Sequence, residues 1–467
     1  MERTLAIKTI EKEGGETVLL KGWVHNVRRV GEKLVFVLLR DRSEVVQTVF
    51  YKPDLDEATA ALVDEIRPEW VIELEGVIQK REGKQANEDM ATGTVEIGAT
   101  KLAVLNKAKT PPFEINKYTL GINEDLRLKH RYLDLRSERM QRNIRERDRI
   151  ITFFRTHMHE NDFVEIETPM LMKGTPEGSR EYLVPSRVNK GHFYALPQSP
   201  QQYKQLCMVA GFERYFQIAR CMRDEDLRGD RQPEFAQLDF EMSFVEQEDV
   251  LAYTEAMFIK LVKTLYPEKK LKTPFVRMTY AESMEKYGTD KPDLRENKED
   301  PNELAFAWIL DFPMFEENED GTIAAMHHPF CSVKEEDKDK FMKGEELLSI
   351  RANAYDLVLN GYELSSGSIR IHNKEEQKQV FKLLSISEEE QEEKFGHILE
   401  AFNYGAPPHG GFAPGIDRVV MLMLGEPNIR EVIAFPKNLD AREPMTNAPT
   451  ALPQEVLDDV HIQVKND

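Results

Sequence analysis

Hydrophobic and polar residues alternate with a period of two in five short segments of the first hundred or so residues. The segments are 18–24, 34–39, 45–50, 71–78 and 94–104, and turns that contain Gly, Asp or Pro separate them. Alternation of this kind predicts half-buried β-strands. Five such strands in succession predict a small closed or partly open barrel, of which the OB-fold is the commonest nucleic-acid-binding form.

The same alternation flanks a charged loop within residues 216–244, which predicts an antiparallel hairpin. The charges continue along both arms of this hairpin, as Arg223, Glu225, Glu234 and Asp239 illustrate. Charges on the body of a sheet are costly unless they meet a charged ligand. A ligand-binding surface is therefore one interpretation, and a solvated hairpin with surface ion pairs is the other.

The remaining pattern mixes helices and strands. Residues 107–123 contain Pro-Pro and no periodicity, which indicates a linker. Apolar residues recur at helical spacing within 144–158, and a short strand is expected at 163–167 before a Thr-Pro pair. Further helices are expected at 250–266 and 419–424. The pattern predicts an α+β domain after the barrel.

Composition limits the possible partners. The 467 residues carry a net charge of −20, with 40% hydrophobic and 31% charged residues, as in a globular enzyme of two or three domains. Such an acidic chain has no general affinity for nucleic acid, so an RNA partner requires basic residues concentrated locally. Two basic stretches, 21–42 and 127–155, meet this requirement.

Several classes of protein are disfavoured. The N-terminus lacks a signal-peptide pattern and no apolar run approaches the length of a membrane span, so we expect a cytoplasmic protein with no membrane partner. The three cysteines show no CxxC or Cys/His spacing, which argues against a disulfide framework or a zinc site. The chain also has no GxxxxGK[ST] loop, so bound phosphates would have to be held by arginine and Mg²⁺.

The sequence of the charged hairpin loop, RDEDLRGDRQPEF, resembles motif 2 of class II aminoacyl-tRNA synthetases, and that of the bacterial-type aspartyl enzymes in particular. The hairpin places motif 2 at about 214–244. A helix followed by a strand that ends in Pro, about 144–170, is similar to motif 1, and GFAPGIDR with its helix, about 411–424, is similar to motif 3. The resemblance covers nearly the whole chain, except that the domain usually inserted between DKPDLR and WILDFP is missing near 294–305.

The resemblance implies an α+β architecture. An OB-fold anticodon-binding domain would occupy 1–106, a hinge 107–137, and a class II catalytic domain of antiparallel sheet flanked by helices 138–467. It also implies a homodimer built through motif 1. The implied activity is the ATP-dependent conversion of L-aspartate to aspartyl-adenylate, followed by transfer to the 3′ end of tRNA(Asp). The implied partners are L-aspartate, ATP, Mg²⁺ and tRNA, with no DNA.

The resemblance further implies roles for individual residues. Arg223 would contact the α-phosphate and the reacting carboxylate, Arg418 would contact the γ-phosphate, and these two would be the catalytic residues. Aspartate would be bound by Glu177, Ser199, Gln201, Lys204, Arg223, Asp239, His327 and Arg370. ATP would be bound by Arg223, Asp224, Glu225, Gln232, Phe235, Glu363, Gly415, Ile416, Asp417 and Arg418. Mg²⁺ would be held by Asp356 and Glu363, and tRNA would be contacted by Arg28, Phe36, Gln47 and Arg228.

The residue types assigned to this site suit the chemistry of the implied reaction. Joining two anions requires positioning and neutralisation of charge rather than a general base. Arg370 and Lys204 set against a substrate carboxylate would reject asparagine, because its amide would leave both cations unpaired. For Phe36 alone, barrel core and base-stacking remain alternative interpretations.

Three alternative functions remain open at this point. The first is aspartylation of tRNA(Asn) as well as tRNA(Asp). The second is a non-catalytic tRNA-binding paralogue, which would be expected to lose Arg223, Arg418 or Glu363, although all three are present. The third is a ligase that uses ammonia instead of tRNA, which the basic barrel disfavours.

Overall fold

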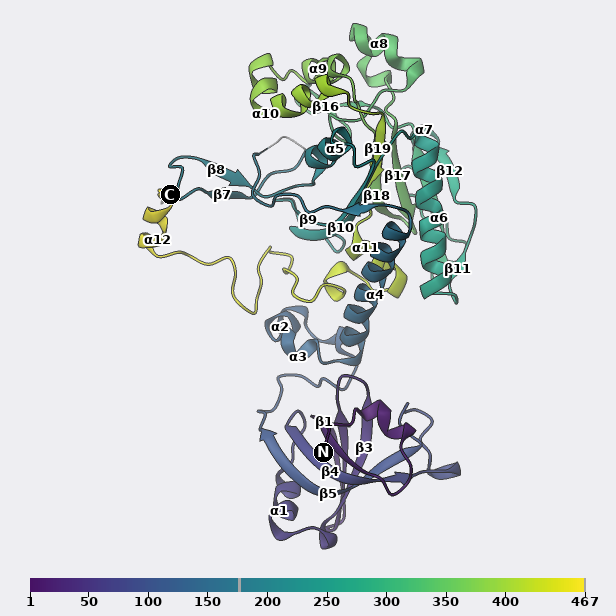
Figure 1. The fold of residues 1–467 in the computed structure, drawn as a ribbon, viewed down its shortest axis with the longest axis vertical. Helices are drawn as coiled ribbons and strands as arrows, with labels where there is room; N and C mark the ends of the chain where they lie inside the picture. The colour runs from purple at the N-terminus through teal and green to yellow at the C-terminus, as the bar shows by residue number, and fades with distance from the viewer. Residues whose placement is uncertain (175–177, 466–467) are drawn as a thin grey trace. The chain divides into compact units, whose positions relative to one another are not determined.

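The computed structural model describes residues 1–174 and 178–465, which divide into two compact units (Figure 1). The first unit comprises Met1–Arg127 with Tyr132–Arg139, and the second comprises Leu128–Arg131 with Met140–Asp467. Each unit has its own hydrophobic core. None of the helices in the described part of the chain has the length and the apolar character that a membrane crossing requires.

The first unit is a closed barrel of five strands in the order β1-β2-β3-β5-β4, so all five predicted strands are present. β3 and β5 pair parallel and the other neighbours pair antiparallel. Buried and partly exposed residues alternate along β2 and β3, which places every second side chain in the barrel core. The strands are β1 (Thr17–Val30), β2 (Leu34–Arg40), β3 (Val45–Tyr51), β4 (Val71–Lys80) and β5 (Val95–Asn106).

Short helices complete the region up to residue 134. The predicted linker at 107–137 contains helical turns. Within the first unit, the buried Arg127 pairs with Asp134 at 3.2 Å. The helices are η1 (Ala6–Glu11), η2 (Lys52–Asp54), α1 (Glu57–Glu65), η3 (Gly83–Gln85), η4 (Thr119–Gly121), α2 (Glu124–Lys129) and α3 (Arg131–Asp134).

The second unit is built on an eight-stranded sheet in the order β12-β14-β17-β18-β19-β10-β9-β6. The six inner strands pair antiparallel, but the edge strands β12 and β6 pair parallel with their neighbours, so the sheet is mixed rather than antiparallel throughout. Parallel neighbours require long connections, and both edge strands are linked to their neighbours in that way. The strands are β6 (Val164–Glu165), β9 (Arg214–Met222), β10 (Glu234–Ser243), β12 (Val276–Thr279), β14 (Phe306–Leu310), β17 (Ala354–Leu359), β18 (Tyr362–Ile369) and β19 (His409–Phe412).

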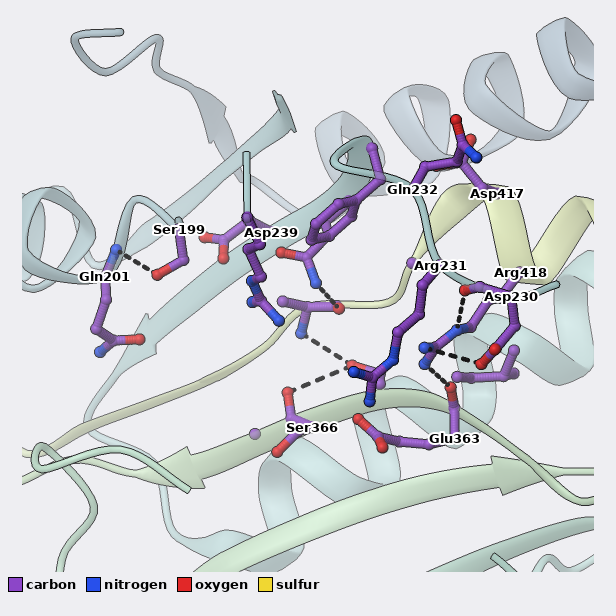
Figure 2. Close-up of a pocket in the computed structure, with 18 of the residues that line it drawn as sticks. Ser199, Gln201, Asp230, Arg231, Gln232, Asp239, Glu363, Ser366, Asp417 and Arg418 are labelled. Carbon is purple, nitrogen blue, oxygen red and sulfur yellow. Dashed lines mark hydrogen bonds and ion pairs between the residues drawn. The ribbon is translucent and has the colours of Figure 1, made fainter. Parts of the chain in front are cut away.

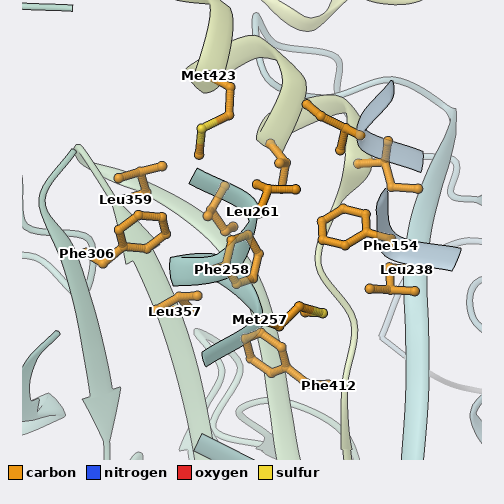
Figure 3. Packing of buried hydrophobic residues seen from close by; sticks show 14 of the residues in the cluster. Phe154, Leu238, Met257, Phe258, Leu261, Phe306, Leu357, Leu359, Phe412 and Met423 are labelled. Carbon is orange, nitrogen blue, oxygen red and sulfur yellow. The ribbon is translucent and has the colours of Figure 1, made fainter. Parts of the chain in front are cut away.

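One face of this sheet packs against three helices: α4 (Glu138–Glu160), α6 (Gln247–Leu265) and α11 (Ile416–Leu424). Figure 3 shows Phe154 of α4, Phe258 of α6 and Met423 of α11 in a common core with strand residues such as Phe306 and Phe412. These helices are the ones expected from the helical patterns at 144–158, 250–266 and 419–424. Since one face is filled by apolar side chains, polar side chains on the inner strands must point to the opposite face.

The remaining elements surround the sheet, and in Figure 1 α8, α9 and α10 gather at one end of this unit. They are β7 (Leu183–Pro185), β8 (Phe193–Ala195), α5 (Gln201–Val209), β11 (Lys270–Leu271), α7 (Tyr280–Tyr287), β13 (Glu303–Leu304), β15 (Phe315–Glu317), β16 (Ile323–Ala325), η5 (Glu335–Asp337), α8 (Lys338–Lys343), η6 (Leu347–Ser349), α9 (Lys374–Leu383), α10 (Glu388–Ala401), η7 (Phe402–Tyr404), η8 (Ile429–Glu431) and α12 (Gln454–Asp459).

Candidate active site

A cavity of about 270 Å³ lies on the face of the second unit's sheet opposite α4 and α6, and mostly polar side chains line it. Its wall combines residues from α5, β10, β18 and α11 with Arg223, which directly follows β9, and it includes Arg370 and Arg418, which are far apart from Arg223 in the sequence. In Figure 2, Ser199, Gln201 and Asp239 lie at one end and Asp230, Glu363 and Arg418 at the other. The cavity is therefore elongated between two chemically different ends.

Four buried charges form the first end. Arg370 donates two hydrogen bonds to the Glu241 carboxylate, Nε to Oε1 at 2.9 Å and Nη2 to Oε2 at 3.2 Å. The Lys204 ammonium contacts Asp239 at 2.8 Å and Glu241 at 3.3 Å. All four residues are at most 2% exposed, so the network is held out of water. Buried charges of this kind are stable only when paired and hydrogen-bonded.

Arg370 and Lys204 keep N–H donors that could bind a ligand. Arg370 also donates from Nη1 to Ser368 at 2.6 Å and to Nε2 of His328 at 2.7 Å, which uses four of its five N–H groups. Lys204 donates one hydrogen bond, to Asp239, and its nitrogen lies 3.3 Å from Glu241, so at most two of its three N–H groups are used. Each cation thus keeps one donor that no described residue accepts, and both side chains line the cavity.

Burial and charge shift the proton affinities of this end. Burial raises the pKa of Asp239 above its ordinary value, although Lys204 opposes the shift. Burial acts in the same sense on Glu241, but Arg370 and Lys204 outweigh it and its pKa is lowered. Burial, reinforced by Arg370, holds the pKa of His328 well below its usual range. His328 is therefore neutral, and its Nε2 accepts from the guanidinium of Arg370.

Local structure explains how these residues converge. On β10, Leu238 and Phe240 enter the core, so Asp239 and Glu241 face the cavity. Gly411 on the neighbouring strand β19 leaves room for this arrangement, since a Cβ there would lie 1.9 Å from a Glu241 carboxylate oxygen. Helical spacing on α5 presents Gln201, Lys204 and Gln205 on one buried face.

The second end is also rich in arginine. The guanidinium of Arg223 lies over the Phe235 ring, with its carbon 5.1 Å from the centroid, and its Nε donates to the Gln198 carbonyl at 3.4 Å. Arg223 forms no ion pair with any residue of the described ranges. Arg418 pairs with Asp230 at 3.1 Å and donates to the Glu363 carbonyl at 2.6 Å. Arg223 therefore has a guanidinium charge that no carboxylate of the described residues neutralises, and it is available to an anionic ligand.

The loop of the charged hairpin is held in place by its own charges. The Glu225 carboxylate accepts from Arg231 at 3.1 Å and from the Ser179 hydroxyl. Asp224 is exposed and does not line the cavity; its backbone N–H donates to the Arg180 carbonyl. Of the residues predicted to bind ATP, Glu225 therefore faces the cavity and Asp224 does not.

Three other residues predicted to bind ATP have their side chains engaged elsewhere. Both ends of the Gln232 amide bond the backbone of Lys437, at 3.0 and 2.7 Å. Asp417 lines the cavity, but its carboxylate accepts from Arg147 and from the Ala236 N–H. Ile416 is fully buried in the main core, so only its backbone is available. Glu177, predicted to bind aspartate, lies outside the described residues.

A second cavity adjoins the first, and the two share Ser199, Gln201, Arg223, His328, Glu363 and Ser366. His327 lines this second cavity and its Nε2 bonds Asp356 at 3.1 Å. Although burial opposes it, Asp356 raises the pKa of His327 above its ordinary value. His327 therefore sits beside the predicted metal ligand, and its neighbour His328 occupies the place beside Arg370.

The two predicted Mg²⁺ ligands, Asp356 and Glu363, both line the second cavity. Glu363 pairs with Lys291 at 2.9 Å. Among the described residues, no group of three or more His, Cys, Asp or Glu side chains is placed to enclose a metal. Two hard oxygen donors beside an anion-binding cavity suit an ion that keeps waters and takes further oxygens from a phosphate ligand. The residues present fit Mg²⁺ in that form.

The tRNA-binding candidates of the barrel lie together on its outer face. Phe36 on β2 is directly opposite Arg28 on β1, whose guanidinium carbon lies 4.7 Å above the ring. Phe36 is only partly buried between the core residues Val35 and Val37, which excludes the interpretation of a core residue. Gln47 on β3 donates to Glu96 at 2.9 Å. Arg228, the remaining candidate, is exposed in the hairpin loop of the second unit.

The sequence analysis assigned no role to four residues that the structure brings to these sites: Glu241, His328, Asp230 and Glu96. Glu241 was detectable, because it lies two residues after Asp239 in a strand and must share its face. The other three were not, since their contacts join segments distant in the sequence.

Comparison with known proteins agrees with the architecture. A family model described as tRNA synthetases class II (D, K and N) matches residues 123–439, and a model described as an OB-fold nucleic acid binding domain matches residues 18–105. The asparaginyl-tRNA synthetase of Pyrococcus horikoshii, solved with asparaginyl-adenylate, has the same fold, with a TM-score of 0.75 and 20% identity over 93% of this chain and 98% of that one.

Curated relatives are more similar in sequence. The aspartate–tRNA(Asp/Asn) ligase of Rubrobacter xylanophilus is 41% identical over 574 positions, covering 96% of this chain and 95% of the relative. The aspartate–tRNA ligase of Oceanobacillus iheyensis is 39% identical and covers 100% and 99%. The aspartate–tRNA(Asp/Asn) ligase of Bacillus subtilis is 40% identical and covers 97% of each.

An OB-fold barrel joined to this catalytic domain defines a class II aminoacyl-tRNA synthetase, an enzyme class that uses ATP. The chain belongs to the class II tRNA synthetases (D, K and N), and within them to the aspartate–tRNA ligases of the bacterial type.

Proposed function

We propose that the protein is an aspartate–tRNA ligase, which activates L-aspartate with ATP and transfers the aspartyl group to the 3′ end of tRNA(Asp). The observation that carries the proposal is the position of Arg223. Its guanidinium, which forms no ion pair among the described residues, lines the same cavity as a buried network of paired charges and Arg418. A fixed cation at that point is placed to bring two anionic reactants together.

The first chemical step joins the aspartate carboxylate to the α-phosphate of ATP and releases pyrophosphate. Arg223 contacts the carboxylate and the α-phosphate, and offsets the negative charge that accumulates on the phosphoryl oxygens. Arg418, held by Asp230 and the Glu363 carbonyl, contacts the γ-phosphate. Positioning and charge neutralisation account for the acceleration, so no side chain has to remove a proton.

Nucleotide binding uses the flanks of Arg223. The adenine ring stacks on Phe235 and bonds Glu225, and the backbone of 415–417 lies beside the phosphates. Gln232 and Asp417 act indirectly, because their side chains fix Lys437 and Arg147. Mg²⁺, held by Asp356 and Glu363, supplies further positive charge to the phosphates when bound. Lys291 pairs with Oε2 of Glu363 at 2.9 Å, so Oε1 of the same carboxylate would remain for the ion.

Aspartate is selected by the two cations that keep a free donor. The side-chain carboxylate accepts one hydrogen bond from Lys204 and one from Arg370. Asp239, whose Oδ1 is buried without a partner among the described residues, and Gln201 receive the α-ammonium. Asparagine would set an amide nitrogen against these donors and leave a buried cation unpaired, which can cost about 10⁴-fold in selectivity.

The second step uses both units. Phe36, Arg28 and Gln47 on the barrel bind the anticodon loop by stacking and hydrogen bonds, as OB-folds bind single strands. Arg228 in the hairpin loop contacts the acceptor end. The exposure of Arg28 and Arg228 supports such contacts with a large anionic ligand.

Three further features are part of the proposal. A homodimer would form through α4 and β6, since β6 is an edge strand with Val164 44% exposed. A cytoplasmic location would suit the use of ATP and tRNA.

The missing inserted domain would fall near 294–305, where a short turn leads into β13 and the N–H groups of Glu296 and Asn297 donate to the Glu303 carboxylate. The alignment of 574 positions with a chain of 467 residues requires that the relative carries segments absent here.

Charging assays with purified tRNA(Asp) and tRNA(Asn) test the proposal. Aspartylation of tRNA(Asp) is the expected result. Equal charging of both tRNAs would identify a non-discriminating enzyme, a second candidate that the names of the R. xylanophilus and B. subtilis relatives favour. Aspartate-dependent pyrophosphate exchange without charging of either tRNA would overturn the tRNA assignment, and absence of exchange would favour a non-catalytic paralogue.

A further inference from the structure

A chain of hydrogen bonds leads from the fold's interior to the aspartate end of the cavity. Nδ1 of His409 lies 2.7 Å from the Pro407 carbonyl oxygen, and Nε2 of His409 lies 3.1 Å from Nε2 of Gln205. Oε1 of Gln205 lies 3.2 Å from Nε2 of Gln201. His409 and Gln205 are fully buried and Gln201 is 5% exposed, so water does not compete with these bonds.

The direction of every bond in this chain follows from the first one. A carbonyl oxygen can only accept, so Nδ1 of His409 carries a proton. Burial lowers the pKa of His409, and the ring is neutral at pH 7, which leaves Nε2 as an acceptor. Gln205 must therefore donate to it with its amide nitrogen, and its amide oxygen must face Gln201.

The orientation of Gln201 is then decided. Its amide nitrogen donates to Gln205, while its amide oxygen has no hydrogen-bond partner among the described residues. The Gln201 side chain lines both cavities, and Figure 2 shows it at the wall of the first. With the amide reversed, an N–H donor would face the ligand and repel a cationic group. The buried chain therefore excludes one of the two possible orientations.

We infer that His409 and Gln205 are positioning residues that hold the Gln201 oxygen toward the cavity as an acceptor for the α-ammonium of the amino-acid substrate. The inference rests on the proposed function, because it concerns how the same site recognises aspartate. It assigns the choice between an amino acid and an otherwise similar dicarboxylate to residues that do not touch the substrate.

The test compares L-aspartate with succinate, which has both carboxylates but no amino group. In Gln205→Leu, the KM for aspartate in pyrophosphate exchange should rise about tenfold or more, as for a lost hydrogen bond to a charged group, with kcat nearly unchanged. The inhibition constant of succinate against aspartate should stay within about twofold, since succinate makes no use of the ammonium acceptor.

Gln202 provides a matched control. It is the neighbouring glutamine on α5, is 2% exposed, does not line either cavity, and its amide makes no hydrogen bond among the described residues. Gln202→Leu should leave both the aspartate KM and the succinate constant unchanged. A second variant, His409→Phe, keeps a ring but removes the acceptor, and should reproduce the selective loss even if Gln205→Leu does not fold.

Two results would overturn the inference and leave the proposed function intact. The first is that Gln205→Leu and His409→Phe weaken the binding of aspartate and of succinate equally. The second is that the aspartate KM of these two variants equals that of Gln202→Leu. A wild-type protein without aspartate-dependent exchange would instead overturn the proposed function itself.

Discussion

The barrel and the catalytic cavity both present arginine to an anionic ligand, but in opposite surroundings. Arg28 on the barrel is exposed and rests on Phe36 without an ion pair among the described residues. Arg370 in the cavity is 2% exposed and is held by Glu241, Ser368 and His328. The first can follow a flexible single strand, whereas the second is fixed before the ligand arrives.

The difference has an energetic consequence. An exposed cation costs little to maintain, its attraction is screened by salt, and its loss leaves nothing unpaired. A buried cation is part of the fold, and its removal leaves a carboxylate in a medium of low polarity. We therefore expect variants of the cavity to affect stability or chemistry strongly, and variants of the barrel to affect tRNA binding alone.

The largest effect is expected for Arg370→Leu. It leaves Glu241, which is fully buried, with Lys204 as its remaining ion-pair partner, so the free energy of unfolding should fall by about 3–5 kcal/mol. Urea denaturation measures this change. Arg277→Leu removes an arginine from an exposed pair with Glu248 and should cost about 1 kcal/mol or less. Equal losses in the two variants would contradict the contrast between buried and exposed charge.

Arg223→Ala comes next. Because Arg223 has no ion pair among the described residues, stability should change little, whereas aspartate-dependent pyrophosphate exchange should fall about 10²- to 10³-fold. Arg220→Ala is the control, since Arg220 lies three residues earlier on β9, pairs with Glu234 and does not line the cavity. Near-normal exchange in Arg223→Ala would remove this residue from the mechanism.

A smaller effect is expected on the barrel. Phe36→Ala removes one stacking surface, which is worth about 1–3 kcal/mol per base, so the KM for tRNA should rise by roughly 5- to 100-fold. Pyrophosphate exchange, which does not use tRNA, should be unchanged and serves as the internal control. A loss of exchange in this variant would contradict the independence of the two regions.

The smallest effect concerns pH. The pKa of His328 is held well below 6.5 in the folded protein, so below about pH 6.5 the unfolded chain binds a proton that the folded protein does not. Stability is therefore present above that pH and is lost as the pH falls, by up to about 1.4 kcal/mol per pH unit. Urea denaturation between pH 5 and 8 measures how the free energy of unfolding depends on pH. Below about pH 6.5, the slope of this dependence should be smaller in His328→Gln than in the wild type, by the amount that corresponds to about one proton. An unchanged slope would mean that His328 is protonated in the fold.

Much of the fold was readable from local patterns. The five barrel strands, the hairpin and the helices at 144–158 and 250–266 follow from periods of two and of 3.6, because side-chain direction is a local property of the backbone. The parallel pairing of β6 and β12 at the sheet edges was not readable, since strand neighbours separated by long connections are chosen by packing of the whole sheet.

The candidate site divides in the same way. The order of the motifs predicted that four cationic residues serve one site, and all four line one cavity in the structure. They are Lys204, Arg223, Arg370 and Arg418. The sequence alone could not distinguish His327 from His328, or anticipate that Gln232 is occupied by Lys437. The side chains of His327 and His328 point in different directions. Which of the two contacts Arg370 depends on how their loop packs against a strand that is distant in the sequence.

The sequence by itself determined the residue types, their order and the face of each element on which they lie. Tertiary structure decided which charges are neutralised by partners, as Arg370 is by Glu241, and which remain available, as Arg223 does. The physical reason is that burial and pairing set the energy of a charge, and both arise only when segments far apart in the chain are brought together.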